Sequence, residues 1–170
     1  GLPVTEMLGG RVTDELRTYT YLYPNDPDED IYANGGVYVD PEVAASTAAT
    51  YVSQGHTAVK LDPMGGYYAQ DPRMPSLQRL DLAERMVGSI REAVGSDADI
   101  LFGTHGQFSP AGALRLAARI ERFEPLWFEE PVPPDNLESM RQVAAGTRIP
   151  IAAGERLTTK YEFAPLLASG

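Results

Sequence analysis

Ionisable side chains follow apolar runs at four separate places in this 170-residue sequence. They are Lys60 and Asp62, then His105, then Glu129, and finally Glu155. If the runs are strands of one parallel sheet, these side chains gather at the strands' carboxyl ends, where α/β proteins place active sites. Two carboxylates would repel each other there unless a cation lay between them. Because Mg2+ uses carboxylate oxygens, Glu129 and Glu155 could hold it, or they could be solvated rim residues.

The stretch Trp127-Phe128-Glu129-Glu130-Pro131 shows how a carboxylate can be delivered to such an end. The two aromatic residues favour a buried strand, whereas an unpaired buried carboxylate is costly. Pro131 ends the strand because it has no N–H to donate to the ladder. The apolar run is therefore expected to carry Glu129 to the strand's end.

Three other residues have several possible roles. Lys60 could be an ion-pair partner, a solvated rim lysine, or a base or electrophile with a lowered pKa. Asp62 precedes Pro63 and could simply be a turn residue. Of the two histidines, His56 lies before a strand and fits a structural role. His105 lies at a carboxyl end and could be a general acid or base.

The elements that would position these side chains alternate regularly along the chain. This alternation predicts a parallel sheet with right-handed crossovers, in an α/β fold. Five units could be a complete open sheet or about five-eighths of a (β/α)8 barrel. No glycine-rich phosphate loop follows any strand, which weakens the nucleotide-binding form of the open sheet. The expected strands are 18–23, 57–63, 99–105, 126–131 and 149–155, and the expected helices are 40–55, 76–95, 109–123, 136–146 and 158–170.

Composition narrows the possible partners. With 14 basic and 24 acidic residues the net charge is −10, which argues against nucleic acid or an anionic membrane as the main partner. An anionic metabolite stays possible because a divalent cation can invert the local charge. There is no cysteine, hence no disulfide or thiolate chemistry. No apolar stretch approaches membrane-spanning length and residues 1–10 lack a signal-peptide layout, so a cytoplasmic protein is expected.

The order of the motifs resembles the enolase superfamily. The closest subgroup is that of mandelate racemase, on its sugar-acid, galactonate dehydratase-like branch, and the resemblance covers essentially the whole chain. It implies a modified (β/α)8 TIM-type barrel, of which residues 1–170 form about five units of the C-terminal barrel domain. An N-terminal capping domain and the last barrel strands would lie outside this chain. The matching motifs are Lys60-x-Asp62-Pro63, His105-Gly106, Trp127 to Pro131, and residues 151–156, IAAGER.

The resemblance also implies a reaction. It is a Mg2+-dependent dehydration, in which a base abstracts the proton α to a substrate carboxylate and water is then eliminated from the β position. Glu129 and Glu155 match the second and third metal ligands, and Lys60 matches a lysine of the second strand. Asp62 stands where racemases carry a second, basic lysine, which favours a dehydratase. His105 matches the acid that protonates the leaving hydroxyl.

The remaining expectations concern partners and neighbouring residues. The implied partner is a small acid sugar, and the full-length protein is expected to be a homo-oligomer. Glu130 is expected to face away from the site and to pair with a neighbouring strand or helix. Loops 23–36 and 63–75 are polar and rich in glycine and proline, so they are expected either to contact substrate or to be plain surface loops.

One position departs from the family pattern. Where the family has an aspartate ligand at the end of the third strand, this sequence has Gly103. Two alternatives to the dehydratase stay open. One is a racemase or cycloisomerase on the same scaffold, and the other, to which Gly103 points, is a non-catalytic relative or a binding module. The family's Asp–His base dyad lies on later strands, so this chain is expected to be a segment of a longer protein.

Overall fold

The sheet is parallel throughout, as predicted. A computed structural model describes residues 1–24, 28, 30, 35–65 and 73–169. The five strands follow one another in chain order across the sheet, β1-β2-β3-β4-β5. They are β1 (Thr20–Tyr21), β2 (Ala58–Leu61), β3 (Asp99–Gly103), β4 (Trp127–Glu129) and β5 (Ile151–Ala152). Because all four pairings between neighbouring strands are parallel, every strand's carboxyl end points to the same edge of the sheet.

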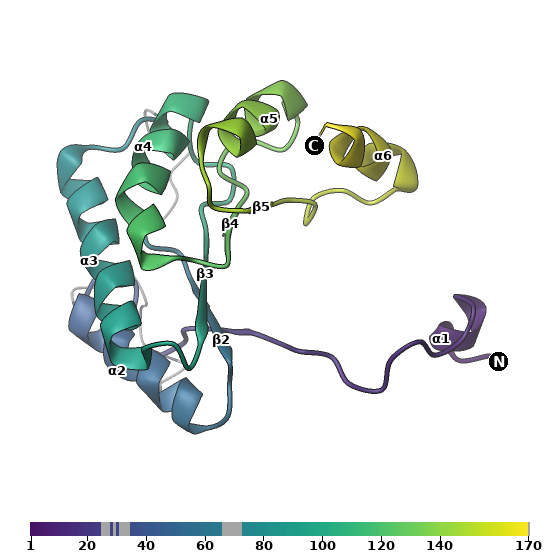
Figure 1. Cartoon of the computed structure of the whole chain (residues 1–170), viewed down its shortest axis with the longest axis horizontal. Helices are drawn as coiled ribbons and strands as arrows, with labels where there is room; N and C mark the ends of the chain where they lie inside the picture. The colour runs from purple at the N-terminus through teal and green to yellow at the C-terminus, as the bar shows by residue number, and fades with distance from the viewer. Residues whose placement is uncertain (25–27, 29, 31–34, 66–72, 170) are drawn as a thin grey trace.

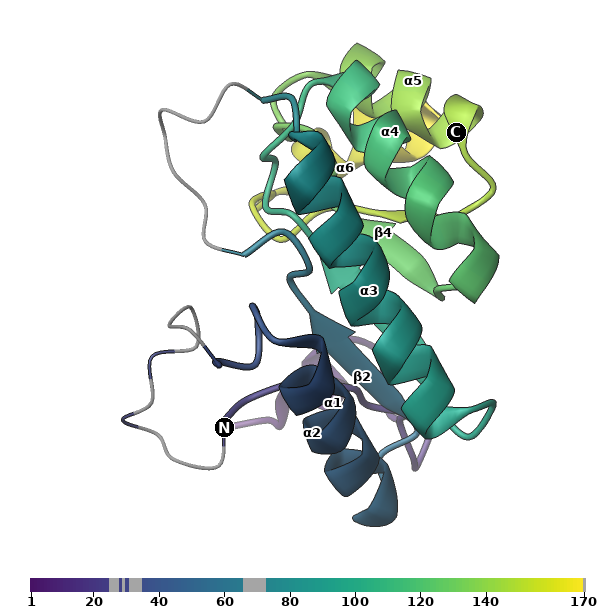
Figure 2. The same ribbon diagram turned by 90° about the vertical axis from the view of Figure 1, so that its left-hand side faces the viewer.

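Four helices form a layer on one face of this sheet (Figures 1 and 2). Each lies between two strands in the chain, which confirms the predicted alternation. They are α2 (Pro41–Ser53), α3 (Leu77–Val94), α4 (Pro110–Ile120), which continues into the 3-10 turn η1 (Glu121–Phe123), and α5 (Leu137–Gly146). The short helix α1 (Val4–Met7), which the sequence did not predict, lies apart from this layer at the end of the N-terminal segment, whereas α6 (Lys160–Ala168) follows β5 and lines a pocket together with α5.

Side-chain caps fix where these helices begin. Asp40 accepts a hydrogen bond from the backbone N–H of Glu42 at 2.9 Å, and Pro41 follows at the first helical position. Ser76, Ser109 and Asn136 cap α3, α4 and α5 in the same way. Such caps satisfy backbone N–H groups that have no partner within the helix. The helix starts were therefore readable from local sequence.

The core fills the space between the sheet and the helical layer. Phe102 of β3 and Phe128 of β4 are fully buried, and their rings stack with centroids 4.4 Å apart. Leu80 and Ile90 of α3 and Leu116 of α4 pack against the same cluster. Burying one such side chain contributes about 1.5–3 kcal/mol. This core holds the strands in the register that brings their ends together.

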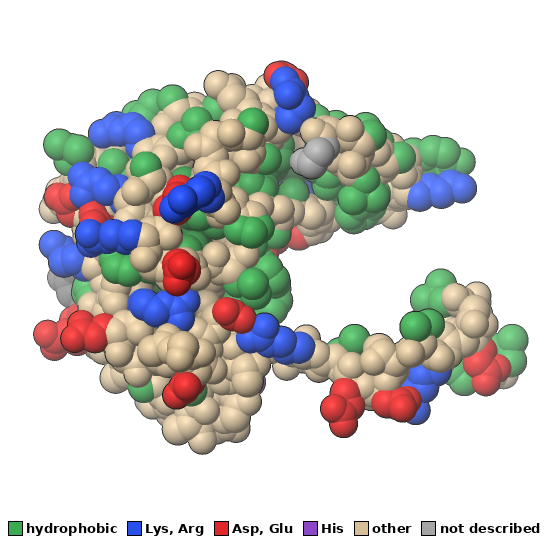
Figure 3. Space-filling view, viewed as in Figure 1, with side chains coloured by type: hydrophobic (Ala, Val, Ile, Leu, Met, Phe, Trp, Pro, Cys, Tyr) green, Lys and Arg blue, Asp and Glu red, His purple; other side chains and the backbone are tan. Residues whose placement is uncertain are grey.

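Both ends of the described chain project from this body and expose apolar side chains (Figure 3). In the N-terminal segment Leu8 and Val12 are 81% and 97% exposed, and in α6 Tyr161 and Leu167 are 77% and 78% exposed. None of the helices in the described part of the chain combines the length and the apolar character needed to cross a bilayer.

Candidate active site

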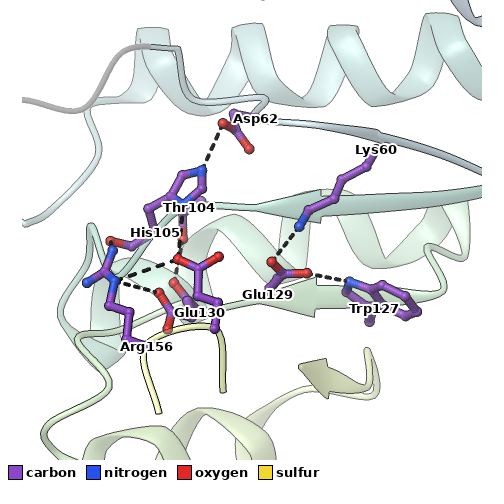
Figure 4. Close-up of polar contacts among 9 residues, drawn as sticks. Lys60, Asp62, Thr104, His105, Trp127, Glu129, Glu130 and Arg156 are labelled. Carbon is purple, nitrogen blue, oxygen red and sulfur yellow. Dashed lines mark hydrogen bonds and ion pairs between the residues drawn. The ribbon is translucent and has the colours of Figure 1, made fainter. Parts of the chain in front are cut away.

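The predicted site residues meet at the carboxyl edge of the sheet (Figure 4). Lys60 lies in β2 and Asp62 just beyond it, Glu129 ends β4, and Glu155 follows β5. Gly103 ends β3 and pairs in register with Glu129. Direct contacts among these side chains, described below, confirm that the strand ends converge.

Lys60 and Glu129 form a buried ion pair. The ammonium contacts Glu129 Oε1, and the two side chains are only 2% and 15% exposed. The second carboxylate oxygen accepts a hydrogen bond from Trp127 Nε1 at 3.1 Å. The ammonium also lies 5.5 Å and 4.9 Å from the ring centroids of Tyr19 and Tyr21, a distance at which cations attract aromatic faces. Of the roles predicted for Lys60, the structure therefore favours the ion-pair partner and excludes the solvated rim lysine.

His105 bridges two carboxylates. Its Nε2 lies 3.1 Å from Asp62 Oδ2, and its Nδ1 lies 3.5 Å from Glu155 Oε1. The hydrogen bond with Asp62 is the main cause that raises the pKa of His105 to about 9; burial opposes this and Glu155 adds to it. The ring is therefore charged at neutral pH and carries a proton on each nitrogen. His105 thus has the protonation state that a general acid needs.

Raising the pH is expected to weaken the fold through His105. The folded state raises its pKa from 6.5 to about 9, so between these values the folded protein holds a proton that the unfolded chain has lost. The stabilising contribution is complete below the lower value and is lost as the pH rises through the upper one. Urea denaturation on both sides of this range checks the prediction. The wild type should lose more stability than His105→Asn, and equal losses would contradict it.

Glu130 corrects a prediction, because it does not face away from the site. Its side chain is 1% exposed at the same edge of the sheet (Figure 4). Arg156 Nε lies 3.4 Å from Glu130 Oε2, an ion pair without a hydrogen bond, since neither carboxylate oxygen has a hydrogen-bond partner. Burial, and then the charge of Glu155, raises the pKa of Glu130 to about 7. Glu130 therefore pairs with Arg156, which follows the neighbouring strand β5 as the prediction allowed, but this pair lies in the site.

The backbone places Glu130 there by leaving the strand conformation. Its φ is +39°, and His105 on the neighbouring strand end has a φ of +48°. Two hydrogen bonds link these strand ends. Thr104 Oγ1 donates to the Glu130 carbonyl at 3.1 Å, and Gly106 N donates to the same carbonyl at 2.7 Å. Arg156 Nη2 also donates to the His105 carbonyl at 2.9 Å. The left-handed turns and Arg156 therefore organise the site.

The donor set does not fit a three-carboxylate Mg2+ site. Both oxygens of Glu129 already accept from Lys60 and Trp127, and no group of three or more His, Cys, Asp or Glu side chains that could hold a metal ion occurs among the described residues. A Cβ added at Gly103 would lie 3.5 Å from Asp62 Oδ1 and 3.7 Å from Glu129 Cβ. The vacant position thus faces the site but supplies no ligand. That Glu129 and Glu155 bind one cation stays a prediction.

The two predicted substrate loops cannot be placed in this site. Loops 23–36 and 63–75 fall mostly outside the described residues. Arg73, at the end of the second loop, donates from Nη1 to the Gly106 carbonyl at 3.1 Å. That part of the loop is thus tied to the turn after His105.

Comparison with known families identifies the scaffold. The model of the enolase C-terminal domain-like family matches residues 42–170. The chain belongs to this family. The resemblance to the enolase superfamily is thereby confirmed, and so is the fold, because the solved relatives are TIM-barrel proteins and the five parallel strands form part of such a barrel.

Three relatives show how this enolase-family chain compares with whole proteins. A D-gluconate dehydratase from Thermoproteus tenax is 34% identical over 174 residues, covering 100% of this chain and 31% of that protein. A D-xylonate dehydratase from Haloferax volcanii is 31% identical, covering 94% of this chain and 37% of that protein. The structure of a mandelate racemase/muconate lactonizing enzyme from Jannaschia sp. CCS1 is 54% identical, with a TM-score of 0.89, and is matched over 99% of this chain and 42% of that one.

The chain spans well under half the length of these enolase-family relatives. Several relatives are named sugar-acid dehydratases, as the predicted branch implied. Members of the superfamily generally use Mg2+.

Proposed function

We propose that the whole protein containing this chain is an acid-sugar dehydratase, a hydro-lyase of the enolase superfamily. The observation that carries the proposal is His105, a charged imidazole held between Asp62 and Glu155 at the carboxyl edge of the sheet. Relatives named gluconate, xylonate and galactonate dehydratase support the class of substrate.

The reaction requires a proton donor for the leaving group. A base removes the α-proton of the acid sugar, the electron pair forms the carbon–carbon double bond, and the β-hydroxyl leaves as water with a proton from His105. The enol then becomes a 2-keto-3-deoxy acid. Asp62 holds the ring for this step through its contact with His105 Nε2. We assign the base to none of the described residues, and Mg2+, the superfamily's general cofactor, carries no step in this proposal.

Product analysis tests the proposal. We expect the whole protein to convert at least one of gluconate, galactonate and xylonate into a 2-keto-3-deoxy acid that lacks one water by mass spectrometry. The reason is that all three carry the α-proton and the β-hydroxyl that the reaction consumes. Conversion to an epimer without loss of water would contradict the dehydratase and favour the racemase alternative.

A second candidate is a relative that binds an acid sugar without turning it over. The observation that favours it is Gly103, which removes one carboxylate from the edge of the sheet. Saturable binding of the same three acids by calorimetry, with no new product after long incubation, would select this candidate. If the whole protein neither bound nor converted any of these acids, both candidate functions would be contradicted.

A further inference from the structure

Protein cations occupy the edge of the sheet where the family pattern places a divalent cation. Lys60 contacts Glu129, and Arg156 lies 3.4 Å from Glu130 Oε2 and 3.6 Å from Glu155 Oε1. His105 contacts Asp62 and Glu155. Among the described residues, each of the four carboxylates at this edge, Asp62, Glu129, Glu130 and Glu155, therefore has a basic side chain of this chain beside it (Figure 4).

We infer that the Lys60 ammonium takes the place of the divalent cation beside Glu129, and that the whole protein binds Mg2+ and Mn2+ only weakly at these strand ends. Two features of the chain together produce this result. Gly103 removes one anionic ligand, and Lys60 neutralises another from within the fold. The inference concerns the cation alone and holds whichever acid sugar is the substrate.

The Lys60–Glu129 contact opposes metal binding directly. A metal ion on Glu129 would have to displace an ammonium that is 2% exposed and also faces two tyrosine rings. The displaced ammonium would then remain close to a dication, and like charges at short distance in a partly buried site repel strongly. Mg2+ moreover gives up its own hydration reluctantly. The buried pair is thus the more stable arrangement.

The space at Gly103 makes the inference testable. An added Cβ would lie 3.5 Å from Asp62 Oδ1, 3.6 Å from Lys60 Cε and 3.7 Å from Glu129 Cβ, all ordinary van der Waals distances. An aspartate at this position would begin inside the site without a backbone clash. Gly103→Asp therefore adds an anionic ligand, and Gly103→Asn adds nearly the same shape without the charge.

Titration with Mn2+ measures the affinity independently of turnover. The whole protein is titrated while the electron paramagnetic resonance signal of free Mn2+ is followed, with Mg2+ as competitor. We expect the wild type to bind Mn2+ more weakly than about 10⁻³ M, and Gly103→Asp to bind at least about tenfold more tightly, because ligand charge sets the affinity of such sites. Gly103→Asn should behave as the wild type does, and circular dichroism checks that both variants fold.

Three results would overturn the inference. The first is one micromolar Mn2+ site per chain in the wild type, which needs no variant to be seen. The second is equal tightening by Gly103→Asp and Gly103→Asn, which would show that shape and not charge matters. The third is tight binding by the wild type that Asp62→Asn abolishes, which would make Asp62 the missing ligand. Dehydratase activity is scored separately, so a protein that turns over acid sugars and also binds Mn2+ tightly contradicts only this inference.

Discussion

Replacing His105 with Asn is expected to slow dehydration by the whole protein about 10²–10⁴-fold, the usual effect of removing a general acid. Asn remains polar and is among the residues that adopt a positive φ, so it suits the +48° backbone at this position. It has no titratable proton to give to the leaving hydroxyl. The rate of 2-keto-3-deoxy acid formation measures the loss.

Proton exchange separates this role from substrate binding. Exchange at the α-carbon, followed in deuterated water by mass spectrometry, should partly survive in His105→Asn because another group removes that proton. The matched control is His56→Asn, since His56 lies before β2 and packs against Tyr51 with ring centroids 5.5 Å apart. It should leave both rates unchanged. Equal losses of exchange and dehydration in His105→Asn would remove the acid role and make His105 part of binding or proton abstraction.

Replacing Lys60 with Met is expected to lower the free energy of unfolding by about 3–5 kcal/mol, because it leaves the buried charge of Glu129 without its cation. The methionine side chain keeps most of the length of the lysine side chain but lacks its ammonium group. Urea denaturation of the whole protein measures the change.

Two controls show whether burial causes this loss. The double variant Lys60→Met with Glu129→Gln removes both charges and should recover most of the stability. Arg148→Met removes a cation from an exposed pair, in which Arg148 Nε lies 2.6 Å from Glu121 Oε1 and the side chains are 89% and 28% exposed. It should cost no more than about 1 kcal/mol. A loss in Lys60→Met no larger than in Arg148→Met would contradict the buried ion pair.

The elements of the fold were predictable because their signals are local. Asp40, Ser109 and the glycine at position 95 mark helix ends within one turn of sequence, and each strand is an apolar run. The strand lengths were overestimated, since β1 and β5 have only two residues each. Pairing needs a neighbour on the sheet, and that information is not local. Only the match to a known family distinguished a barrel segment from a complete open sheet of five units.

The site was predictable as far as strand order decides it. Lys60, His105 and Glu129 follow apolar runs, and parallel strands bring such positions together. The roles of Glu130 and Arg156 were missed, because they depend on the turn that the chain takes after the strand. A glutamate with a φ of +39° has no signal in its own residue type. The bond from Trp127 to Glu129 was also missed, although a spacing of two residues on a strand places both on one face.

At the left-handed positions His105 and Glu130, the residue type that would make the fold most stable differs from the one that the site uses. Glycine would adopt either conformation with less strain, and an apolar residue at position 130 would avoid burying a carboxylate that makes no hydrogen bond. Strain of this kind collects where side chains are held for chemistry. Engineering this scaffold for thermal stability alone would therefore favour replacing both residues. The resulting variant would lack the proton donor His105 and the carboxylate of Glu130 that pairs with Arg156.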